Sequence, residues 1–326
     1  MSASASSGLG VSYSVASGPA SLSGNVLSFT GTGTVTITAA QGGDGNYNAA
    51  SSVNQSFSVN PISTTFSLSS TSFNYTGSAQ GPTVIASPGG ATFSTGGTLS
   101  ATNAGSYTAT ATATGGYSGS NSSLTWAINQ LTQTITFNNP GTQTYGTPLT
   151  LSATASSGLA VSYGVTSGPA TLSGSVLTFT GTGSVTITAS QAGNTNFNAA
   201  SNVSQTFTVD PQPATFSLSA TSFTYSGSPQ GPSVIASPGG ATFSTGGTLS
   251  ATNVGGYTAT ATATGNYTGS NTGLGWNIAA GSQSITFNNP GAQVASVPLT
   301  LGATASSGWR FRMPSRRARP RSRATW

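Results

Sequence analysis

Cysteine, histidine, lysine and glutamate are absent from this chain of 326 residues. Acid–base catalysis, nucleophilic catalysis and metal binding all require titratable or ligating side chains that are held near one another. Only Asp44 and Asp210 carry negative charge, and 150 positions away the chain has Asn194 and Asn60 in their places. We therefore expect no enzyme: no catalytic, cofactor-binding or metal-binding residue, and no cofactor.

Positive charge is missing from most of the chain as well. The net charge of +5 comes from seven arginines, all between Arg310 and Arg323, against two aspartates. Such a basic tail is typical of an arm that binds nucleic acid or an anionic membrane. The alternative is a shifted reading frame, because back-translating residues 309–326 with one added C gives a peptide that matches residues 159–176 at all but two positions. We interpret 309–326 as a frameshifted basic tail and expect no specific nucleic-acid partner.

Long apolar runs are also lacking. The sequence has no stretch of about 18 consecutive apolar residues, which predicts that no segment spans a membrane. A chain so poor in charge would often be disordered. Here 35% of the residues are hydrophobic, and they alternate with Ser and Thr, which number 110 of 326. This alternation favours β-strands.

An internal repeat of 150 residues organises the chain. Shifted by that distance, Trp126 falls on Trp276 and Gln133 on Gln283 without a gap. Residues 1–60 and 131–210 are the first and second long segments, and residues 61–130 and 211–280 are the first and second short segments. We expect 1–60 to form an Ig-like module that lacks its first strand, 61–130 and 211–280 to form β modules, 131–210 to form a complete Ig-like module, and 281–308 to begin a third.

The long segments alternate apolar and hydroxyl residues at period two, which predicts half-buried strands at 161–165, 185–189 and 205–209, with another at 133–137. Residues 172–179 predict a hairpin that turns at Gly174. Twelve apolar residues are identical in the two copies, and we interpret them as core packing: Val11, Tyr13, Val15, Leu22, Val26, Leu27, Phe29, Val35, Ile37, Val53, Phe57 and Val59. Tyr47 becomes Phe197, which indicates a ring that packs.

The short segments predict strands at 215–219, 223–227, 257–264 and 276–278, consistent with a small antiparallel sandwich. No helical period is present. The predicted fold class is therefore all-β: tandem Ig-like antiparallel β-sandwich modules in an extended array.

Turn and core motifs carry a resemblance to known families. The long segment, with Gln133-Thr-Ile-Thr-Phe, Tyr145-Gly-Thr-Pro and Ser167-Gly-Pro-Ala, resembles the bacterial Ig-like repeats of large surface and secreted proteins. The short segment, with Tyr225-Ser-Gly-Ser-Pro and Gly265-Asn-Tyr-Thr-Gly, resembles the MBG/YGX-type Ig-like domain. The resemblance implies extracellular β-sandwich spacers of adhesin-like proteins without catalytic residues.

Two features suggest a binding function as an alternative. Four threonines share one face of a strand in each short segment, and such a ladder can match an ice or glycan lattice: Thr108, Thr110, Thr112, Thr114, Thr258, Thr260, Thr262 and Thr264. The alternative interpretation is that the threonines, which are strong β-formers, make an ordinary solvent-exposed face, with Ala109, Ala111 and Ala113 facing the core. Tyr117 and Tyr267, in Gly-rich loops, could stack on carbohydrate or could simply pack.

The sequence thus predicts a non-catalytic stalk or spacer of a bacterial cell-surface or secreted adhesin-like protein, located outside the cell. The alternative is a glycan- or ice-binding β module. Surface glycans or other surface proteins are the expected partners. A further expected partner is a second copy: the strand at 283–287 lacks its module and the first long segment lacks that same strand, so strand addition could join chains head to tail.

Overall fold

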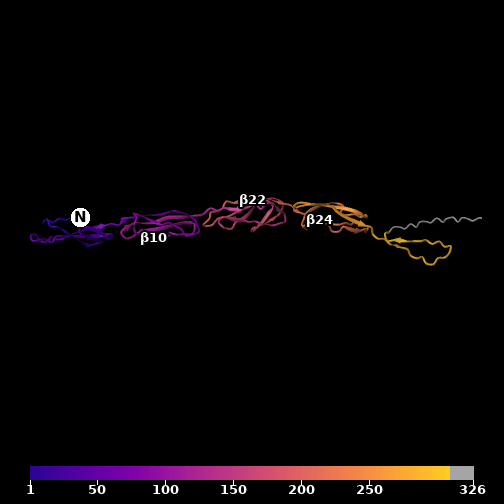
Figure 1. Ribbon diagram of the computed structural model, residues 1–326. Coiled ribbons are helices and arrows are strands. Elements are labelled where there is room, and N and C mark those ends of the chain that lie inside the picture. The colour runs from indigo at the N-terminus through magenta and orange to yellow at the C-terminus, as the bar shows by residue number, and fades with distance from the viewer. Residues whose placement is uncertain (309–326) are drawn as a thin grey trace, which may run out of the picture. The chain divides into compact units, whose positions relative to one another are not determined.

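The computed structural model describes residues 1–308, and the basic tail predicted at 309–326 lies outside the described residues. Strands and loops make up the whole described range, which contains no helix (Figure 1). The all-β prediction is confirmed. Within residues 1–308 the structure has no helix long and apolar enough to cross a membrane.

The chain divides into two compact units. One unit comprises residues 1–138, 152–164 and 187–205, and the described part of the other comprises residues 139–151, 165–186 and 206–308. The division passes through the second long segment, whose residues are shared between the units.

The second long segment contains nine strands, several of them only two or three residues long: β14 (Ile135–Phe137), β15 (Gln143–Thr144), β16 (Leu149–Thr150), β17 (Ala153–Ala155), β18 (Ser162–Ser167), β19 (Ala170–Ser173), β20 (Val176–Phe179), β21 (Gly183–Ser190) and β22 (Val203–Asp210). They form sheets in the orders β15-β22-β21-β18, β16-β20-β19 and β14-β17. The predicted hairpin is confirmed: Gly174, at φ +60°, joins β19 to β20. The predicted strands at 161–165, 185–189 and 205–209 are confirmed as β18, β21 and β22.

The first long segment repeats the last five of these strands 150 positions earlier: β1 (Ser12–Ser17), β2 (Ala20–Ser23), β3 (Val26–Phe29), β4 (Gly33–Ala40) and β5 (Val53–Val59). They form the sheets β1-β4-β5 and β2-β3. Strands β3 and β5 are therefore edge strands among the described residues, whereas β20 and β22 each have a partner on both sides.

The interpretation of all twelve repeated apolar residues as core is wrong for part of the set. Val26 is 67% exposed and Phe29 is 52% exposed, and Val53 is exposed as well. The described residues of the first long segment contain no counterparts of β14, β15 and β16, and the repeat counterpart of Phe29 in the segment that has these strands, Phe179, is only 5% exposed. Val26 and its counterpart Val176 are exposed in both copies, so these two face outward. Tyr47 is also exposed, which contradicts the prediction that its ring packs.

Each short segment repeats one set of strands. The first contains β6 (Ile62–Ser63), β7 (Thr65–Leu68), β8 (Ser72–Asn74), β9 (Val84–Ser87), β10 (Phe93–Gly97), β11 (Gly105–Ala113), β12 (Tyr117–Ser118) and β13 (Ser120–Asn129). The second contains β23 (Gln212–Pro213), β24 (Thr215–Leu218), β25 (Ser222–Thr224), β26 (Val234–Ser237), β27 (Phe243–Gly247), β28 (Gly255–Ala263), β29 (Tyr267–Thr268) and β30 (Ser270–Ala279). The predicted strands at 215–219, 257–264 and 276–278 are confirmed as β24, β28 and β30, whereas the one predicted at 223–227 ends earlier, as β25.

One four-stranded sheet dominates each short segment, in the order β10-β11-β13-β8 in the first copy. The pairs β10–β11 and β11–β13 are antiparallel, whereas β8 runs parallel to β13. A second, two-stranded sheet of β7 and β9 supplies Phe66, which forms a core cluster with Ala109, Ala111 and Leu124. The indole N–H of Trp126 donates to the carbonyl oxygen of Thr98 at 2.7 Å, so the largest core side chain leaves no buried donor unpaired.

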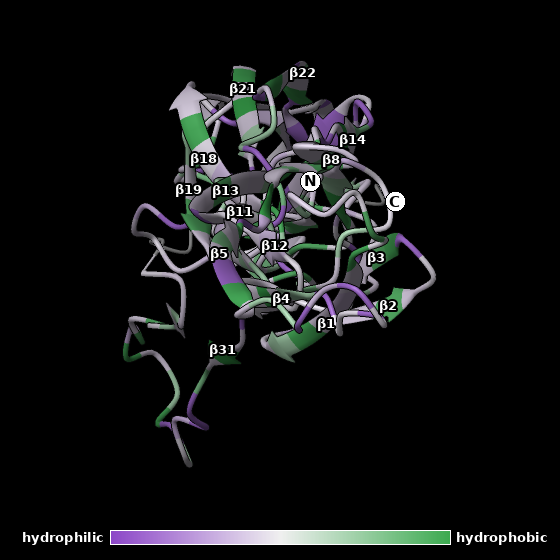
Figure 2. Cartoon of the chain, turned by 90° about the vertical axis from the view of Figure 1, so that its left-hand side faces the viewer, coloured by the Kyte–Doolittle hydropathy of each residue, from purple (hydrophilic) through white to green (hydrophobic). Residues whose placement is uncertain are grey.

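Alternation of side chains explains why these residues form strands. Successive residues of a strand point to opposite faces, so Val, Ile or Phe at every second position fills a core while Ser and Thr contact water. In Figure 2, β18 and β21 carry green apolar bands separated by paler ones. In β21, Val185, Ile187 and Ala189 are fully buried.

Residues 281–308 form little regular structure. The strands β31 (Ile285–Thr286) and β32 (Thr304–Ala305) pair through two residues each. This pairing repeats that of β14 with β17, since Ile285 faces Ala305 as Ile135 faces Ala155. Ile285, Phe287, Val294, Val297, Leu299 and Leu301 are all exposed.

Candidate functional site: the joints between the segments

Chemistry-bearing side chains do not gather anywhere in residues 1–308. No group of three or more His, Cys, Asp or Glu residues lies close enough to hold a metal ion in this range. Every buried side-chain nitrogen or oxygen of these residues has a hydrogen-bond partner. Buried polar groups without partners are what mark many functional sites, so the described residues offer no such marker.

The two aspartates have structural contacts. One carboxylate oxygen of Asp44 accepts hydrogen bonds from the backbone N–H groups of Asn46 and Tyr47 at 2.8 and 2.9 Å. The side-chain oxygen of Asn194 makes the same two bonds in the other copy. Asp44 therefore stabilises a turn that needs an oxygen acceptor and no negative charge. Asp210 ends β22, and its backbone oxygen accepts a hydrogen bond from the N–H of Tyr145 at 2.9 Å.

The joint between the first short and second long segments is fixed by hydrogen bonds within the first unit. Leu131 and Phe197 form a parallel bridge immediately after the last residue of the short segment. The side-chain amide of Gln130 donates to the backbone oxygens of Asn194 and Thr195 at 2.8 and 3.1 Å. The turn at 194–197 therefore contacts residues 130 and 131, which lie at the boundary between the two segments.

Asn196 extends this joint to a more distant part of the short segment. Its side-chain oxygen accepts a hydrogen bond from the backbone N–H of Ala104 at 2.8 Å, and its amide donates to the side-chain oxygen of Asn103 at 3.2 Å. Beside it, the rings of Phe197 and Tyr75 meet edge to face with centroids 5.6 Å apart. A half-buried amide and an aromatic pair thus hold the two segments at points that lie apart in the sequence.

The joint between the second long and second short segments is built differently, within the second unit. The side-chain oxygen of Asn266 accepts a hydrogen bond from the N–H of Thr182 at 3.1 Å, and its backbone oxygen accepts one from Gln212 at 2.9 Å. The rings of Tyr145 and Tyr267 meet edge to face with centroids 5.6 Å apart. Only one residue, Pro211, separates β22 from β23, so the linker itself is short.

The threonine ladders lie on exposed faces, as the sequence predicts, but Thr114 and Thr264 lie just beyond the ends of β11 and β28, so each strand carries three of the four threonines. Thr108 and Thr112 of β11 are exposed and Thr110 is half-buried, while Ala109 and Ala111 on the other face are fully buried. Ladder neighbours on the adjacent strands are small or hydroxyl residues: Gly96 faces Thr110 and Thr125 faces Thr108. The register between β11 and β13 shifts between Ala109 and Ala111, so the ladder is not a regular lattice along its length.

The two candidate tyrosines lie in short strands, which corrects their expected position in loops. Tyr117 begins β12 and pairs with Ile62, and Tyr267 begins β29 and pairs with Gln212. Both rings are half-buried. Tyr267 packs on the core of its own segment and against Tyr145, so the packing interpretation describes it better than a free stacking platform.

The joint residues Asn196 and Asn266 were not singled out by the sequence. Their repeat counterparts are Asn46 and Gly116, which make no corresponding side-chain bond in the structure. The available signal was a mismatch at 266, where one copy has Asn and the other Gly.

Comparison with known proteins finds distant similarity only. No protein-family model matches the sequence, and no curated protein matches it. Among solved structures, the chain is similar to Drosophila N-cadherin EC1-4, with 7% identity over 83% of this chain and 92% of that one and a TM-score of 0.21. It is similar to the I-band fragment I67-I69 from titin, with 13% identity over 67% and 99% and a TM-score of 0.27.

A third similar structure is Bacteroides ovatus SGBP-B, from a mixed-linkage glucan utilization locus, in complex with a mixed-linkage heptasaccharide. The identity is 15% over 67% of this chain and 68% of that one, and the TM-score is 0.16. At these identities and TM-scores, none of the three similarities carries an argument about ligand, partner or activity.

Proposed function

We propose that the chain is a non-catalytic structural spacer of an adhesin-like protein, which stands outside a bacterial cell and holds other elements at a distance. The observation that carries this proposal is the pair of joints, at which amide side chains and aromatic pairs connect one repeat segment to the next. A spacer needs stiffness at its joints, because each flexible joint shortens the mean distance that the array spans.

The side-chain chemistry supports the same proposal. A chain without Cys, His, Lys or Glu has few groups for catalysis or metal binding. A Ser- and Thr-rich surface with almost no charge through residue 308 keeps the β-segments wetted without attracting charged partners. The resemblance of the long and short segments to bacterial Ig-like and MBG-type repeats supports the bacterial, extracellular setting.

The joint between the first short and second long segments provides the test. The chain contains no cysteine, so single cysteines at the exposed Ser94 and Ser201 accept a donor and an acceptor dye without competing sites. Single-molecule energy transfer should give one narrow distance distribution. Asn196→Ala should broaden it, because the bonds to Ala104 and Asn103 are lost. Asn46→Ala, at the repeat counterpart, is the matched control. A distribution that is broad already in the parent chain contradicts the spacer proposal.

A second candidate function is binding of an ordered hydroxyl lattice, of glycan or ice, by the threonine face. The exposure of Thr108 and Thr112, with their counterparts on β28, favours it. Thermal hysteresis and glycan-array binding of the whole chain test this candidate. Activity in either assay that disappears when Thr108 and Thr258 are changed to Lys would support it, and silence in both leaves only the spacer.

A further inference from the structure

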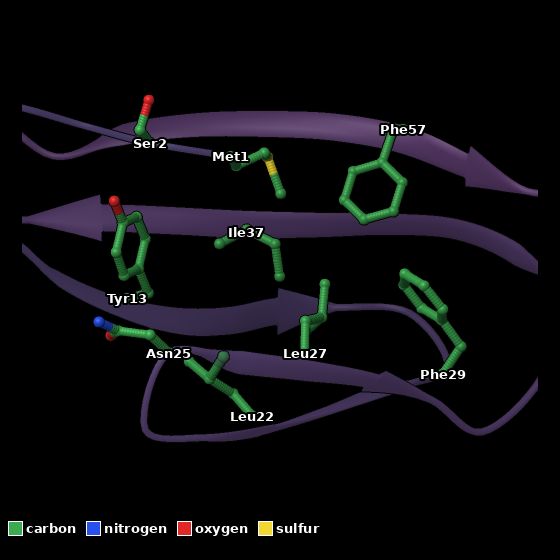
Figure 3. A pocket seen from close by; sticks show the side chains of 9 residues that line it. All are labelled: Met1, Ser2, Tyr13, Leu22, Asn25, Leu27, Phe29, Ile37 and Phe57. Carbon is green, nitrogen blue, oxygen red and sulfur yellow. The ribbon is translucent and has the colours of Figure 1, made fainter.

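An apolar groove opens in the first long segment. A cavity of about 590 Å³ is lined by Leu27 and Phe29 of β3, Ile37 of β4 and Phe57 of β5, among others. In Figure 3 these side chains point into the cavity from three strands, and the side chain of Met1 lies among them. A second cavity of about 320 Å³ shares Ile37 and adds the amide side chains of Gln41 and Gln55. The groove is therefore apolar in its middle and has hydrogen-bonding amides beside it.

The second long segment shows what covers this groove when it is complete. Its residues 133–151 supply β14, β15 and β16, in which Ile135 and Phe137 are buried, as is Leu151 just beyond them. Strand β16 pairs with β20, with Leu149 opposite Leu177, and β15 pairs with the end of β22. With these strands in place, Leu177 is fully buried and Phe179 is 5% exposed.

Side-chain amides anchor the covering residues. Gln205 donates to the backbone oxygen of Phe137 at 2.8 Å, and Asn139 donates to the backbone oxygen of Thr206 at 2.8 Å. The side chain of Gln133 donates to the backbone oxygen of Asn198 at 2.7 Å.

The first long segment keeps the groove's partner in each of these bonds. The counterparts of Gln205, Thr206 and Asn198 are Gln55, Ser56 and Asn48. Gln55 has the same side chain, and the other two contribute a backbone oxygen, which every residue has. The groove therefore has the residues needed to bind a segment whose sequence resembles residues 133–151.

Such a pattern occurs a third time in this chain. Residues 283–301 repeat residues 133–151 at Gln283, Ile285, Phe287, Leu299 and Leu301. In the structure these four apolar side chains are 44–58% exposed. Of these four residues, only Ile285 lies in a strand, β31, which two residue pairs hold to β32. These residues therefore lose few contacts when they leave their present position, and they bury a large apolar surface when they enter the groove.

We propose that residues 283–300 of one copy of this chain fill the groove of the first long segment of a second copy, as an added set of strands. In the complex, Leu299 lies opposite Leu27 in the register of Leu149 and Leu177, and Phe287 packs on Tyr13 as Phe137 packs on Tyr163. Ile285 pairs with Ala5, the counterpart of Ala155. Repetition of this contact joins copies head to tail, so the assembly grows as an open chain.

Sedimentation velocity of the full chain over a range of concentrations is the first experiment. The mean mass should rise with concentration. Deleting residues 309–326 should leave this behaviour unchanged, whereas deleting 281–326 should give a monomer at every concentration. A monomeric full chain overturns the proposal, and so does association that depends on 309–326. Both outcomes leave the spacer proposal untouched, because they do not concern the joints.

Two substitutions separate specific strand addition from general stickiness. Phe287→Asp should abolish association, because its counterpart Phe137 is buried. Val297→Asp is the matched control and should associate normally, since its counterpart Thr147 is exposed. Neither change touches residues 1–280, so both variants keep their other segments. Equal effects of the two substitutions contradict the proposed register.

Cysteine cross-linking tests the register directly. Thr150 lies opposite Val176, so Val26→Cys and Thr300→Cys should face each other between copies. Both residues are exposed, and the chain has no other cysteine. A mixture of the two single variants should form a disulfide-linked dimer under mild oxidation, and Val26→Cys with Val297→Cys should not. A double variant that closes on itself without forming dimers assigns the groove to the same copy's own end and overturns the proposal.

Discussion

The side-chain oxygen of Asn266 accepts a hydrogen bond from the backbone N–H of Thr182 at 3.1 Å, across 84 residues of sequence. Asn266 belongs to the second short segment and Thr182 to the second long segment. At the equivalent joint of the first copy, position 116 is glycine, so no side chain can make this bond. The joint between the first long and first short segments therefore has one side-chain hydrogen bond fewer than the joint between the second long and second short segments.

Asn266→Gly should give the joint between the second long and second short segments the same residue that the first long and first short segments have at theirs. A hydrogen bond of this kind contributes about 1 kcal/mol, so the amide of Thr182 should exchange its hydrogen roughly five times faster. Hydrogen exchange followed by mass spectrometry or NMR measures the change. The amide of Thr180, which donates to the backbone oxygen of Pro169, is the internal reference and should keep its rate. An unchanged rate at Thr182 would show that the bond does not hold the joint.

Leu27 and Leu177 allow the same core substitution to be compared in an open and a covered site. Leu177 is fully buried, so Leu177→Ala should cost about 2–5 kcal/mol of unfolding free energy. Leu27 is half-buried beside the open cavity, so Leu27→Ala should cost clearly less. Urea-dependent hydrogen exchange of β21 and β4 reads each segment separately, in a chain that ends at residue 280. Equal losses would contradict the difference in burial.

Gly168 occupies a backbone conformation that a side chain cannot share. Its φ is +99°, and an added Cβ would lie 2.3 Å from the backbone oxygen of Ser184. Gly168→Ala should therefore lower the unfolding free energy by more than about 1 kcal/mol. Gly164 is the control, because a Cβ there meets nothing within 4 Å. Thermal unfolding of both variants compares them, and a Gly168→Ala variant as stable as Gly164→Ala would be the contrary result.

The strands could be predicted from the sequence because their signal is local. Alternation of apolar and hydroxyl residues marks β18, β21 and β22, and the repeat itself locates the turn at Gly174. The outward threonine face and the buried Ala109 and Ala111 follow from the same alternation. The near identity of the two copies made each of these predictions testable twice within one chain.

Other features depend on distant partners and could not be predicted. The parallel pairing of β8 with β13 joins residues about 55 positions apart. The bonds of Asn196 and Asn266 reach backbone groups more than 80 residues away, and asparagine in a turn gives no sign of its partner. The exposure of Phe29 was also missed, because a residue identical in both copies is buried only where its covering strand is present.

Small-angle X-ray scattering of the chain without residues 281–326 tests the spacer account most directly, since association through those residues then plays no part. A single compact domain of that length would have a radius of gyration of about 19 Å. The account predicts a value well above this, with the scattering profile of a rod that does not change with salt. A radius near that of a compact domain, or the profile of a flexible coil, would contradict it.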